Sequence, residues 1–516
     1  MGNSESSVAF RKDGFFAMKN SYSEELDSYY PVRPECLADV PKTRFKSRVG
    51  KTLSERRWKA AFSKDGYLDI AAVLRRIQRG GIHPSIKGAA WEFLLGCFDP
   101  ESTFQERNQL RLQRREQYAA WKSECQKIVP AVGSGKFITS PIVSDDGQPI
   151  TSDDGQAITS DAEQPITSDD GQPIECATTT STSEDNSDGM PADNDDFGKK
   201  MLQWKLSLHQ IGLDVVRTDR TLLFYENEAN QAKLWDVLAV YAWMDKDIGY
   251  VQGMSDICSP MVILFEHEAD AYWCFERAMR RLRENFKSST DSIGVQSQLG
   301  TLAQIVKTVD PKLHQHLEEL DGGEYLFAFR MLMVLFRREF SFVDSLYLWE
   351  VMWAMEYNPN IYSSYDDKRQ PLLSELLYDD RPGDKHKLKE YGKFERNNLK
   401  TRAAEQNSAL AVFLVASVLE TKHRRLMKEA KGLDDVVQIL GEISGNLDAR
   451  KALDEALKVH KKYLKQASSL STFFNLFPVP NPNPNQKKNM GKTLVIWFPI
   501  WCSVPHESPT NPDARG

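Results

Sequence analysis

The sequence has few of the patterns that mark an enzyme with its own active site. It has no H-E-x-x-H pair, and its nine histidines include only one closely spaced pair, His314 and His316. No G-x-S-x-G segment and no Ser-His-Asp arrangement stands out. The glycine-lysine segments at 133–136 (GSGK) and 491–493 (GKT) each lack a fixed position of a complete phosphate-binding loop. These absences argue against a metal site, a hydrolase triad and a nucleotide site, so we expect no cofactor of the chain's own.

Cysteines are few and scattered, and long apolar runs are missing. The seven cysteines are odd in number and form no C-x-x-C pair, which argues against a disulfide framework and a zinc ribbon. We therefore expect a reducing, cytoplasmic environment. The chain does not open with a charged segment followed by an apolar one, so we do not expect secretion. The longest apolar runs, 409–419 and 494–502, are too short to span a bilayer. The cysteines are Cys36, Cys97, Cys125, Cys176, Cys258, Cys274 and Cys502.

A strong field of one sign is also missing from most of the chain. The formal net charge is -7, but residues 129–200 alone hold fifteen acidic residues against three basic ones. The remainder is therefore slightly basic and close to neutral. Because nucleic acids are bound through basic patches, this balance gives no reason to expect a nucleic-acid partner.

The N-terminus carries one candidate modification signal. Met1, Gly2 and Ser6 satisfy the M-G-x-x-x-S pattern for N-myristoylation of Gly2. One myristoyl chain gives only marginal membrane affinity, so a second signal such as a basic segment is needed for peripheral attachment. The segment at 42–59 is either that signal or a solvated basic linker. Its basic residues, opposed only by Glu55, are Lys42, Arg44, Lys46, Arg48, Lys51, Arg56, Arg57 and Lys59.

The first two fifths of the chain divide into three expected parts. Residues 1–55 lack sustained periodicity and are predicted to be a flexible leader. Residues 56–128 have helical periodicity. Residues 129–198 are predicted to be a disordered acidic insertion, because 144–175 consist of four near-copies of one octapeptide, SDDGQPIT, SDDGQAIT, SDAEQPIT and SDDGQPIE. Such repeats bury too little apolar area to offset chain entropy.

The rest of the chain is predicted to be helical up to about residue 467. Residues 199–427 form the main region, with a surface insertion at 358–395, and residues 428–467 form a C-terminal extension. Residues 468–516 are a Pro/Asn-rich irregular tail, either an interfacial anchor or a product of alternative transcript processing. No convincing alternating strand is present, so an all-α fold is expected. The helices expected in the main region include 272–286, 299–320, 327–336, 343–354 and 403–426.

Two short segments about 35 residues apart carry the candidate functional residues. In the first, Ile211, Asp214 and Arg217 recur every three residues, so on a helix Ile211 can pack, Asp214 can brace and Arg217 can project. The second contains Tyr250 and Gln252, followed by Gly253, Met254 and Asp256. Taken singly, Arg217 is most simply a surface ion pair with Asp214, and Gln252 a buried amide bound by backbone.

Together, the I-x-x-D-x-x-R and Y-x-Q-G-M patterns resemble those of the TBC-domain GTPase-activating proteins, which act on Rab-type small GTPases. The resemblance implies a multi-helix, all-α TBC-type domain that binds a GTP-loaded Rab. It further implies that Arg217 is an arginine finger and that Gln252 orients the attacking water, while GTP and Mg²⁺ belong to the partner. Tyr250, Gly253 and Asp256 would support the loop.

Two further segments resemble the family with one departure each. Lys87 and Trp91 match its R-x-x-x-W motif, but lysine cannot make the planar bidentate contact of arginine. Phe329, Arg330 and Met331 match its F-R-W block with methionine at the third position, where it can fill the same volume. The main interpretation is thus an activator without an active site of its own. The alternative is a non-catalytic GTPase-binding or membrane-trafficking adaptor that uses the same helical surface.

Overall fold

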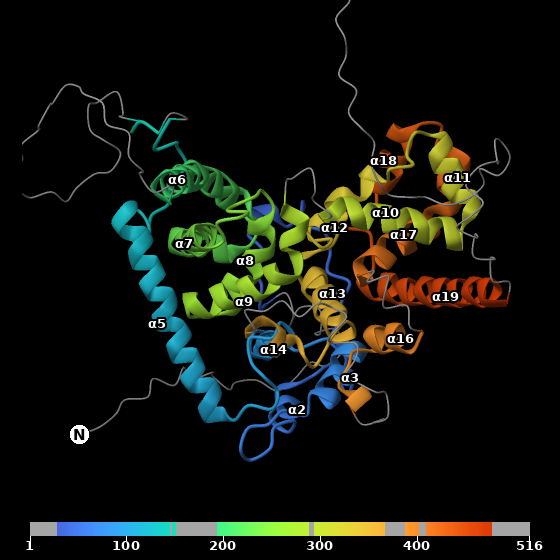
Figure 1. The fold of residues 1–516 in the computed structure, drawn as a ribbon, viewed down its shortest axis with the longest axis horizontal. Coiled ribbons are helices and arrows are strands. Elements are labelled where there is room, and N and C mark those ends of the chain that lie inside the picture. The colour runs from blue at the N-terminus through green and yellow to red at the C-terminus, as the bar shows by residue number, and fades with distance from the viewer. Residues whose placement is uncertain are drawn as a thin grey trace, which may run out of the picture. The chain divides into compact units, whose positions relative to one another are not determined.

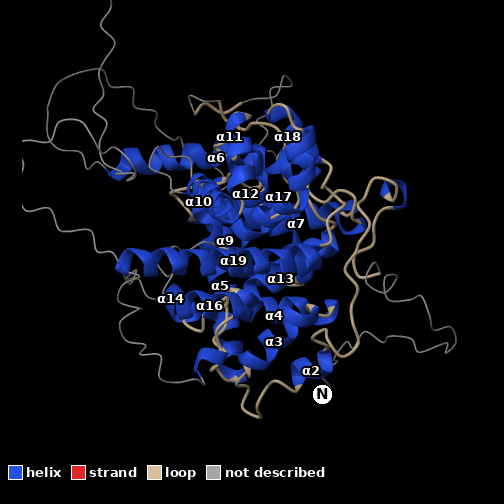
Figure 2. Cartoon of the chain, turned by 90° about the vertical axis from the view of Figure 1, so that its right-hand side faces the viewer, coloured by secondary structure: helices blue, strands red, loops and turns tan. Residues whose placement is uncertain are grey.

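The computed structural model describes residues 28–144, 147–150, 193–287, 294–366, 387–401 and 409–476. Throughout these residues the regular secondary structure is helical, and the extended segments meet only in isolated β-bridges (Figures 1 and 2). The predicted all-α fold is confirmed. None of the helices in the described ranges combines the length and the hydropathy needed to cross a bilayer.

The N-terminal helices are short apart from the last, and α3 shows how the sequence makes them. The Asp69 carboxylate accepts a 2.9 Å hydrogen bond from the amide of Ala72 and caps the helix. Val73 and Ile77 lie on its buried face, as the periodicity predicts. The helix ends at Gly80, where an added Cβ would lie 2.6 Å from the backbone of the segment around Lys51. These helices are α2 (Glu55–Lys59), α3 (Ile70–Gly80), α4 (Lys87–Leu94) and α5 (Phe104–Ile128).

The next four helices form the part of the fold that holds the two candidate motifs. Helix α7 packs against α6, α8 and α9 (Figure 1). Two indoles tie α6 to α7: Trp204 donates to the Ala239 carbonyl at 2.9 Å, and Trp235 donates to the Leu208 carbonyl at 3.0 Å. The helices are α6 (Asp193–Arg217), α7 (Glu228–Met244), α8 (Met254–Leu264) and α9 (Glu268–Leu282).

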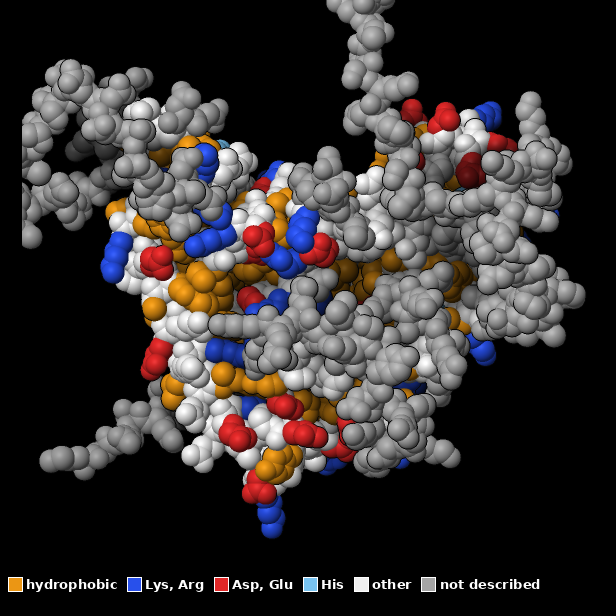
Figure 3. All heavy atoms as spheres, in the orientation of Figure 1, with side chains coloured by type: hydrophobic (Ala, Val, Ile, Leu, Met, Phe, Trp, Pro, Cys, Tyr) orange, Lys and Arg blue, Asp and Glu red, His pale blue; other side chains and the backbone are white. Residues whose placement is uncertain are grey.

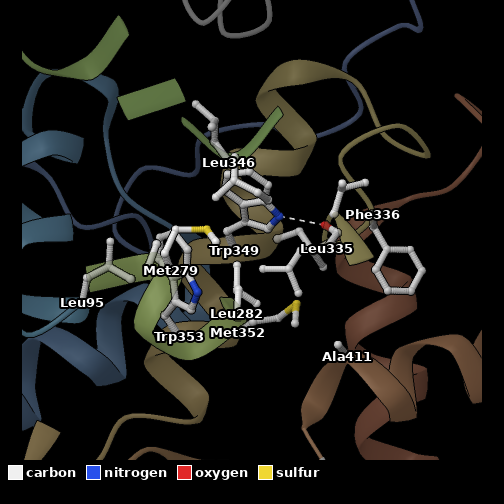
Figure 4. Packing of buried hydrophobic residues seen from close by; sticks show 14 of the residues in the cluster. Leu95, Met279, Leu282, Leu335, Phe336, Leu346, Trp349, Met352, Trp353 and Ala411 are labelled. Atoms are coloured by element: carbon white, nitrogen blue, oxygen red, sulfur yellow. Dashed lines mark hydrogen bonds between the residues drawn. The ribbon is translucent and has the colours of Figure 1, made fainter. Parts of the chain in front are cut away.

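Helix α13 is buried along its whole length and packs against α3, α4 and α16. The Trp349 indole donates a 2.8 Å hydrogen bond to the Leu335 carbonyl, in a cluster that includes Trp353 and Phe336 (Figure 4). This part comprises α10 (Gly294–Val309), α11 (Pro311–Glu319), α12 (Phe329–Met333), α13 (Phe342–Met355), α14 (Ile361–Asp366), α16 (Lys393–Thr401), α17 (Leu410–Glu429), α18 (Leu433–Gly441) and α19 (Ala449–Leu476).

The prediction of a flexible leader over 1–55 is wrong for its second half. Tyr30, Phe45 and Leu53 are buried in the core. The amides of Arg44 and Phe45 donate to the Asp344 carboxylate at 2.9 and 2.6 Å. The segment has no helical periodicity because it packs as an extended strap with buried residues at irregular spacing. The basic residues of 42–59 therefore belong to a packed segment rather than to a free linker.

The edges of the predicted acidic insertion are also folded. Val129 and Val132 are buried, and the amide of Gly133 donates to the Asp236 carboxylate at 3.0 Å. Helix α6 starts at Asp193, inside the predicted 129–198 insertion. The central residues 151–192 lie outside the described ranges. These edges were predicted to belong to the insertion because their hydrophobicity is low. A few well-spaced apolar side chains are nevertheless enough to anchor them.

Three further boundaries differ from prediction. The expected surface insertion at 358–395 contains α14 and the start of α16, where Phe394 is buried. The predicted helix 299–320 is two helices, because Pro311 cannot donate to the preceding turn and Asp310 caps the next helix by accepting from Leu313 at 3.1 Å. Helix α19 continues beyond the predicted end at 467 to Leu476.

Candidate functional site

Arg217 is the last residue of α6, and its side chain is 56% exposed. Its guanidinium pairs with the carboxylate of Asp214, one turn earlier on the same helix. Asp214 is buried, and Ile211 packs in the core on the inner face of the helix. The spacing of three residues therefore gives one anchored residue, one buried acid and one exposed cation.

A tyrosine of the second motif completes the environment of this acid. The hydroxyl of Tyr250 donates a 2.5 Å hydrogen bond to the second carboxylate oxygen of Asp214. Burial, and then the negative charge of Asp214, raise the pKa of Tyr250 well above its usual value, so the phenol stays protonated and remains a donor. Asp214 thus connects Arg217 of the first motif with the loop that carries Gln252.

Gln252 lies in the turn before α8 and is exposed. Within the described residues its amide has no hydrogen-bond partner, which leaves it available to another molecule. The next residue, Gly253, has φ of 105° and caps α8 in the left-handed region. An added Cβ there would lie 3.0 Å from Val334. Both the backbone conformation and the space require glycine at this position.

The first turn of α8 is tied to its neighbours on two sides. The Thr218 hydroxyl hydrogen bonds to the Ser255 hydroxyl at 2.9 Å and to the Asp214 carbonyl at 2.7 Å. The carboxylate of Asp256 accepts from the guanidinium of Arg338 at 2.7 and 3.2 Å. The loop of Gln252 is therefore held by the end of α6 on one side and by the segment after α12 on the other.

Sequence reasoning missed Arg337 and Arg338. Arg337 is buried and pairs with Asp219, which also accepts a 2.6 Å hydrogen bond from the Ser259 hydroxyl. Arg338 is half-exposed and pairs with Asp256. The only sequence signal was a run of charges after a hydrophobic helix, and such a run is most often a solvated face.

Lys87 and Trp91 lie in the core beneath α13 rather than at the two motifs. The Lys87 ammonium and the Trp91 indole both donate to one oxygen of Glu350, at 2.5 and 3.1 Å. The other oxygen accepts from the amide of Ile82 at 3.1 Å. Burial raises the pKa of Glu350 and the Lys87 charge opposes this shift. Lysine therefore makes a single-point contact here, with Trp91 and a backbone amide filling the other positions.

Arg330 braces the turn that follows α12. Its guanidinium pairs with Glu339 at 3.0 and 3.1 Å, and Glu339 is fully buried. Met331 is buried beside it and fills the position of the usual tryptophan. Both residues support the fold around the site and do not reach Arg217 or Gln252 among the described contacts.

Two further expectations concern lipidation and metal binding. Gly2, the lipidation candidate, lies outside the described residues. Of the side chains that the structure describes, no three that could ligate a metal come together.

Basic and acidic side chains are interspersed on the face seen in Figure 3. The site itself is an exposed cation, Arg217, and an exposed amide, Gln252.

Comparison with known proteins links this arrangement to one domain family. The sequence matches the family model of the Rab-GTPase-TBC domain over residues 175–364. This range contains Arg217, Asp214, Tyr250 and Gln252, and it excludes Lys87 and Trp91. Among solved structures, the Ypt/Rab-GAP domain of Gyp1p covers 81% of this chain and 98% of its own, with 15% identity and a TM-score of 0.47.

Several known proteins are similar to this chain in sequence. Rab GTPase-activating protein 22 of Arabidopsis thaliana is 26% identical over 467 residues, covering 78% of this chain and 79% of that protein. TBC1 domain family member 17 of Homo sapiens is 28% identical over 395 residues, covering 76% and 49%. GTPase-activating protein GYP7 of Yarrowia lipolytica is 30% identical over 299 residues, covering 58% and 35%. The chain thus spans about half or less of the human and yeast relatives. Residues 175–364 of the chain thus match the Rab-GTPase-TBC domain family.

Proposed function

We propose that this protein accelerates GTP hydrolysis by a Rab-type small GTPase, with Arg217 and Gln252 acting in trans. One observation carries the proposal. Asp214 pairs with Arg217 and accepts a hydrogen bond from Tyr250, which lies two residues before Gln252 in the sequence. One buried acid therefore connects the exposed cation with the loop that carries the exposed amide. The names of the relatives supply the partner class.

The two side chains match what GTP hydrolysis requires. Negative charge develops on the γ-phosphate oxygens in the transition state, and a guanidinium stabilises it, while an amide orients the attacking water. An arginine finger lowers the barrier by about 4–7 kcal/mol. Separating Arg217 from Asp214 costs less than this, because Arg217 is 56% exposed and the buried Asp214 keeps its hydrogen bond from Tyr250. Arg217 can therefore exchange its carboxylate for a phosphate.

GTP and Mg²⁺ belong, in this proposal, to the partner. The chain contributes a preformed surface, and the partner contributes the phosphate-binding loop that this sequence lacks. The contact is selective for the GTP-bound state, because only that state carries the γ-phosphate that Arg217 would approach. Peripheral membrane contact through Gly2 and the basic segment remains a separate prediction, which the mass of the mature N-terminus would check.

Single-turnover GTP hydrolysis across a panel of Rab-type GTPases tests the proposal. We expect wild-type protein to stimulate at least one of them, and Arg217→Ala and Gln252→Ala each to lower that stimulated rate by at least about tenfold. The matched controls are Arg425→Ala, which removes another exposed arginine paired on its own helix, and Gln315→Ala, which removes another exposed amide. Both controls should retain the wild-type rate.

Two results would contradict the proposal. If no GTPase in the panel is stimulated, the assignment of activity fails. If stimulation survives both substitutions, the assignment of these two side chains fails. Binding that depends on GTP but leaves hydrolysis unchanged would support the non-catalytic adaptor instead.

A further inference from the structure

The segment that follows α12 forms an unusual turn beside the candidate site. The predicted helix 327–336 ends at Met333, and Leu335 and Phe336 both adopt positive φ, 48° and 58°. Two consecutive non-glycine residues in this region are uncommon and persist only where the surroundings hold them. The Trp349 indole, which donates to the Leu335 carbonyl, and the complete burial of Phe336 supply that hold (Figure 4).

This turn directs two successive arginines to two different parts of the site. Arg337 pairs with Asp219, two residues after Arg217. Arg338 pairs with Asp256, four residues after Gln252. A continued helix would place consecutive residues about 100° apart around its axis, so the turn decides where these charges go.

The first turn of α8 connects the ion pair of Arg338 and Asp256 with Gln252. The amide of Asp256 donates to the Gly253 carbonyl at 3.2 Å, and Gly253 packs against Val334 of the same turn. Gln252 itself has no partner among the described residues. Its position therefore depends on the residues that fix the turn around it.

We propose that Arg338 is a positioning residue for Gln252, acting through Asp256. The inference rests on the proposed function and extends it to a third segment of the chain. Arg338 does not act as a second finger, because Nε and a terminal nitrogen of its guanidinium are both engaged by Asp256. Although burial opposes its charge, the neighbouring carboxylates of Asp256, Asp214 and Glu339 raise the pKa of Arg338 and keep it cationic.

Single-turnover hydrolysis at rising protein concentration separates positioning from binding. Arg338→Met should lower the saturating rate by about tenfold, because a misplaced catalytic group loses rate rather than affinity. The concentration at half-saturation should stay within about twofold of wild type. Asp256→Asn should reproduce the effect, and the double variant should be no slower than either single variant. Arg338→Lys should restore part of the rate.

Hydrogen exchange on the protein alone gives a readout that does not depend on any GTPase. Amides of residues 251–257 should exchange faster in Arg338→Met, while those of α13 keep their protection. Arg425→Met is the matched control, since Arg425 is 38% exposed, similar to the 43% of Arg338, and also pairs with a carboxylate. It should change neither the rate nor the exchange of 251–257.

The hydrogen-exchange result and the hydrolysis result distinguish failure of this inference from failure of the proposed function. Faster exchange of 251–257 without stimulation of any GTPase by wild-type protein would uphold the structural link and contradict the proposed function. Unchanged exchange of these amides, additive effects in the double variant, or a loss confined to half-saturation would overturn the role of Arg338.

Discussion

The hydroxyl of Tyr250 donates to the same buried carboxylate, that of Asp214, with which Arg217 pairs. The two motifs therefore meet at one acid, although they are separated by the whole of α7. This connection allows the exposed residues Arg217 and Gln252 to be held at a fixed separation before any partner arrives. Preorganisation of this kind is the main source of rate in phosphoryl transfer.

Removing the tyrosine hydroxyl should weaken both the fold and the proposed activity. Tyr250→Phe leaves one oxygen of the buried Asp214 without its donor, which should lower the free energy of unfolding by about 1–2 kcal/mol. The stimulated hydrolysis rate should fall several-fold, because one of the contacts that join Arg217 to the Gln252 loop is lost. Urea unfolding and the single-turnover assay check these two effects. Tyr67→Phe, at an exposed tyrosine, should change neither.

Gly253 should tolerate no side chain. Gly253→Ala forces a non-glycine residue to φ of 105° and brings its Cβ to 3.0 Å from Val334. We expect a loss of about 2 kcal/mol in the free energy of unfolding, together with a lower stimulated rate. The control is Gly300→Ala in α10, where nothing lies within 4 Å of an added Cβ. That change should leave stability equal or higher by up to about 1 kcal/mol, and an equal loss in both variants would refute the argument.

The buried Lys87 should be essential for stability rather than for activity. Lys87→Met leaves the Glu350 charge buried without its cation, which should cost about 3–5 kcal/mol in the free energy of unfolding. Lys87→Met with Glu350→Gln should recover part of this loss, since glutamine removes the charge and its carbonyl still accepts from Trp91, although its NH2 cannot accept from the Ile82 amide. Lys59→Met, at an exposed lysine paired with Glu55, should change stability by less than about 1 kcal/mol. If the double variant is as unstable as Lys87→Met, the unpaired charge is not the cause.

His460 should contribute a pH dependence to stability in mildly acidic solution. Burial lowers the pKa of His460 to about 4. Its ring packs between Phe394 and Phe413, and its Nε2 lies 2.9 Å from the Asn398 side-chain oxygen. The unfolded state, with a pKa near 6.5, takes up a proton first as pH falls. The contribution of His460 is therefore complete above about pH 6.5 and is lost progressively toward pH 4, by at most about 3 kcal/mol.

Urea unfolding between pH 4 and 7.5 measures this contribution. The variant His460→Gln cannot titrate, so its stability should fall less steeply than that of wild type over the same range. The difference between the two curves isolates His460 from the carboxylates that titrate in the same window. Parallel curves would show that His460 makes no contribution.

Periodic segments were predictable because their signal is local. The buried stripe of α3 and the pairing of Asp214 with Arg217 three residues apart both follow from 3.6-residue spacing. The boundaries that failed depend on distant neighbours instead. Residues 28–53 pack onto the core, and Asp344, some 300 positions away, accepts the amides of Arg44 and Phe45. No local pattern records such a contact.

In the candidate site, too, some features were predictable from the sequence and others depend on distant contacts. The helical nature of the scaffold was predictable from the residue pattern, whereas Arg217 and Gln252 became candidates only because their two motifs resemble those of the TBC family. The contacts that hold those side chains in place came only with folding. Tyr250 meets Asp214 across α7, and Arg338 meets Asp256 because the chain turns at Leu335 and Phe336. Helical periodicity acts over a few residues, whereas these hydrogen bonds require the long-range packing that brings separate helices to one surface.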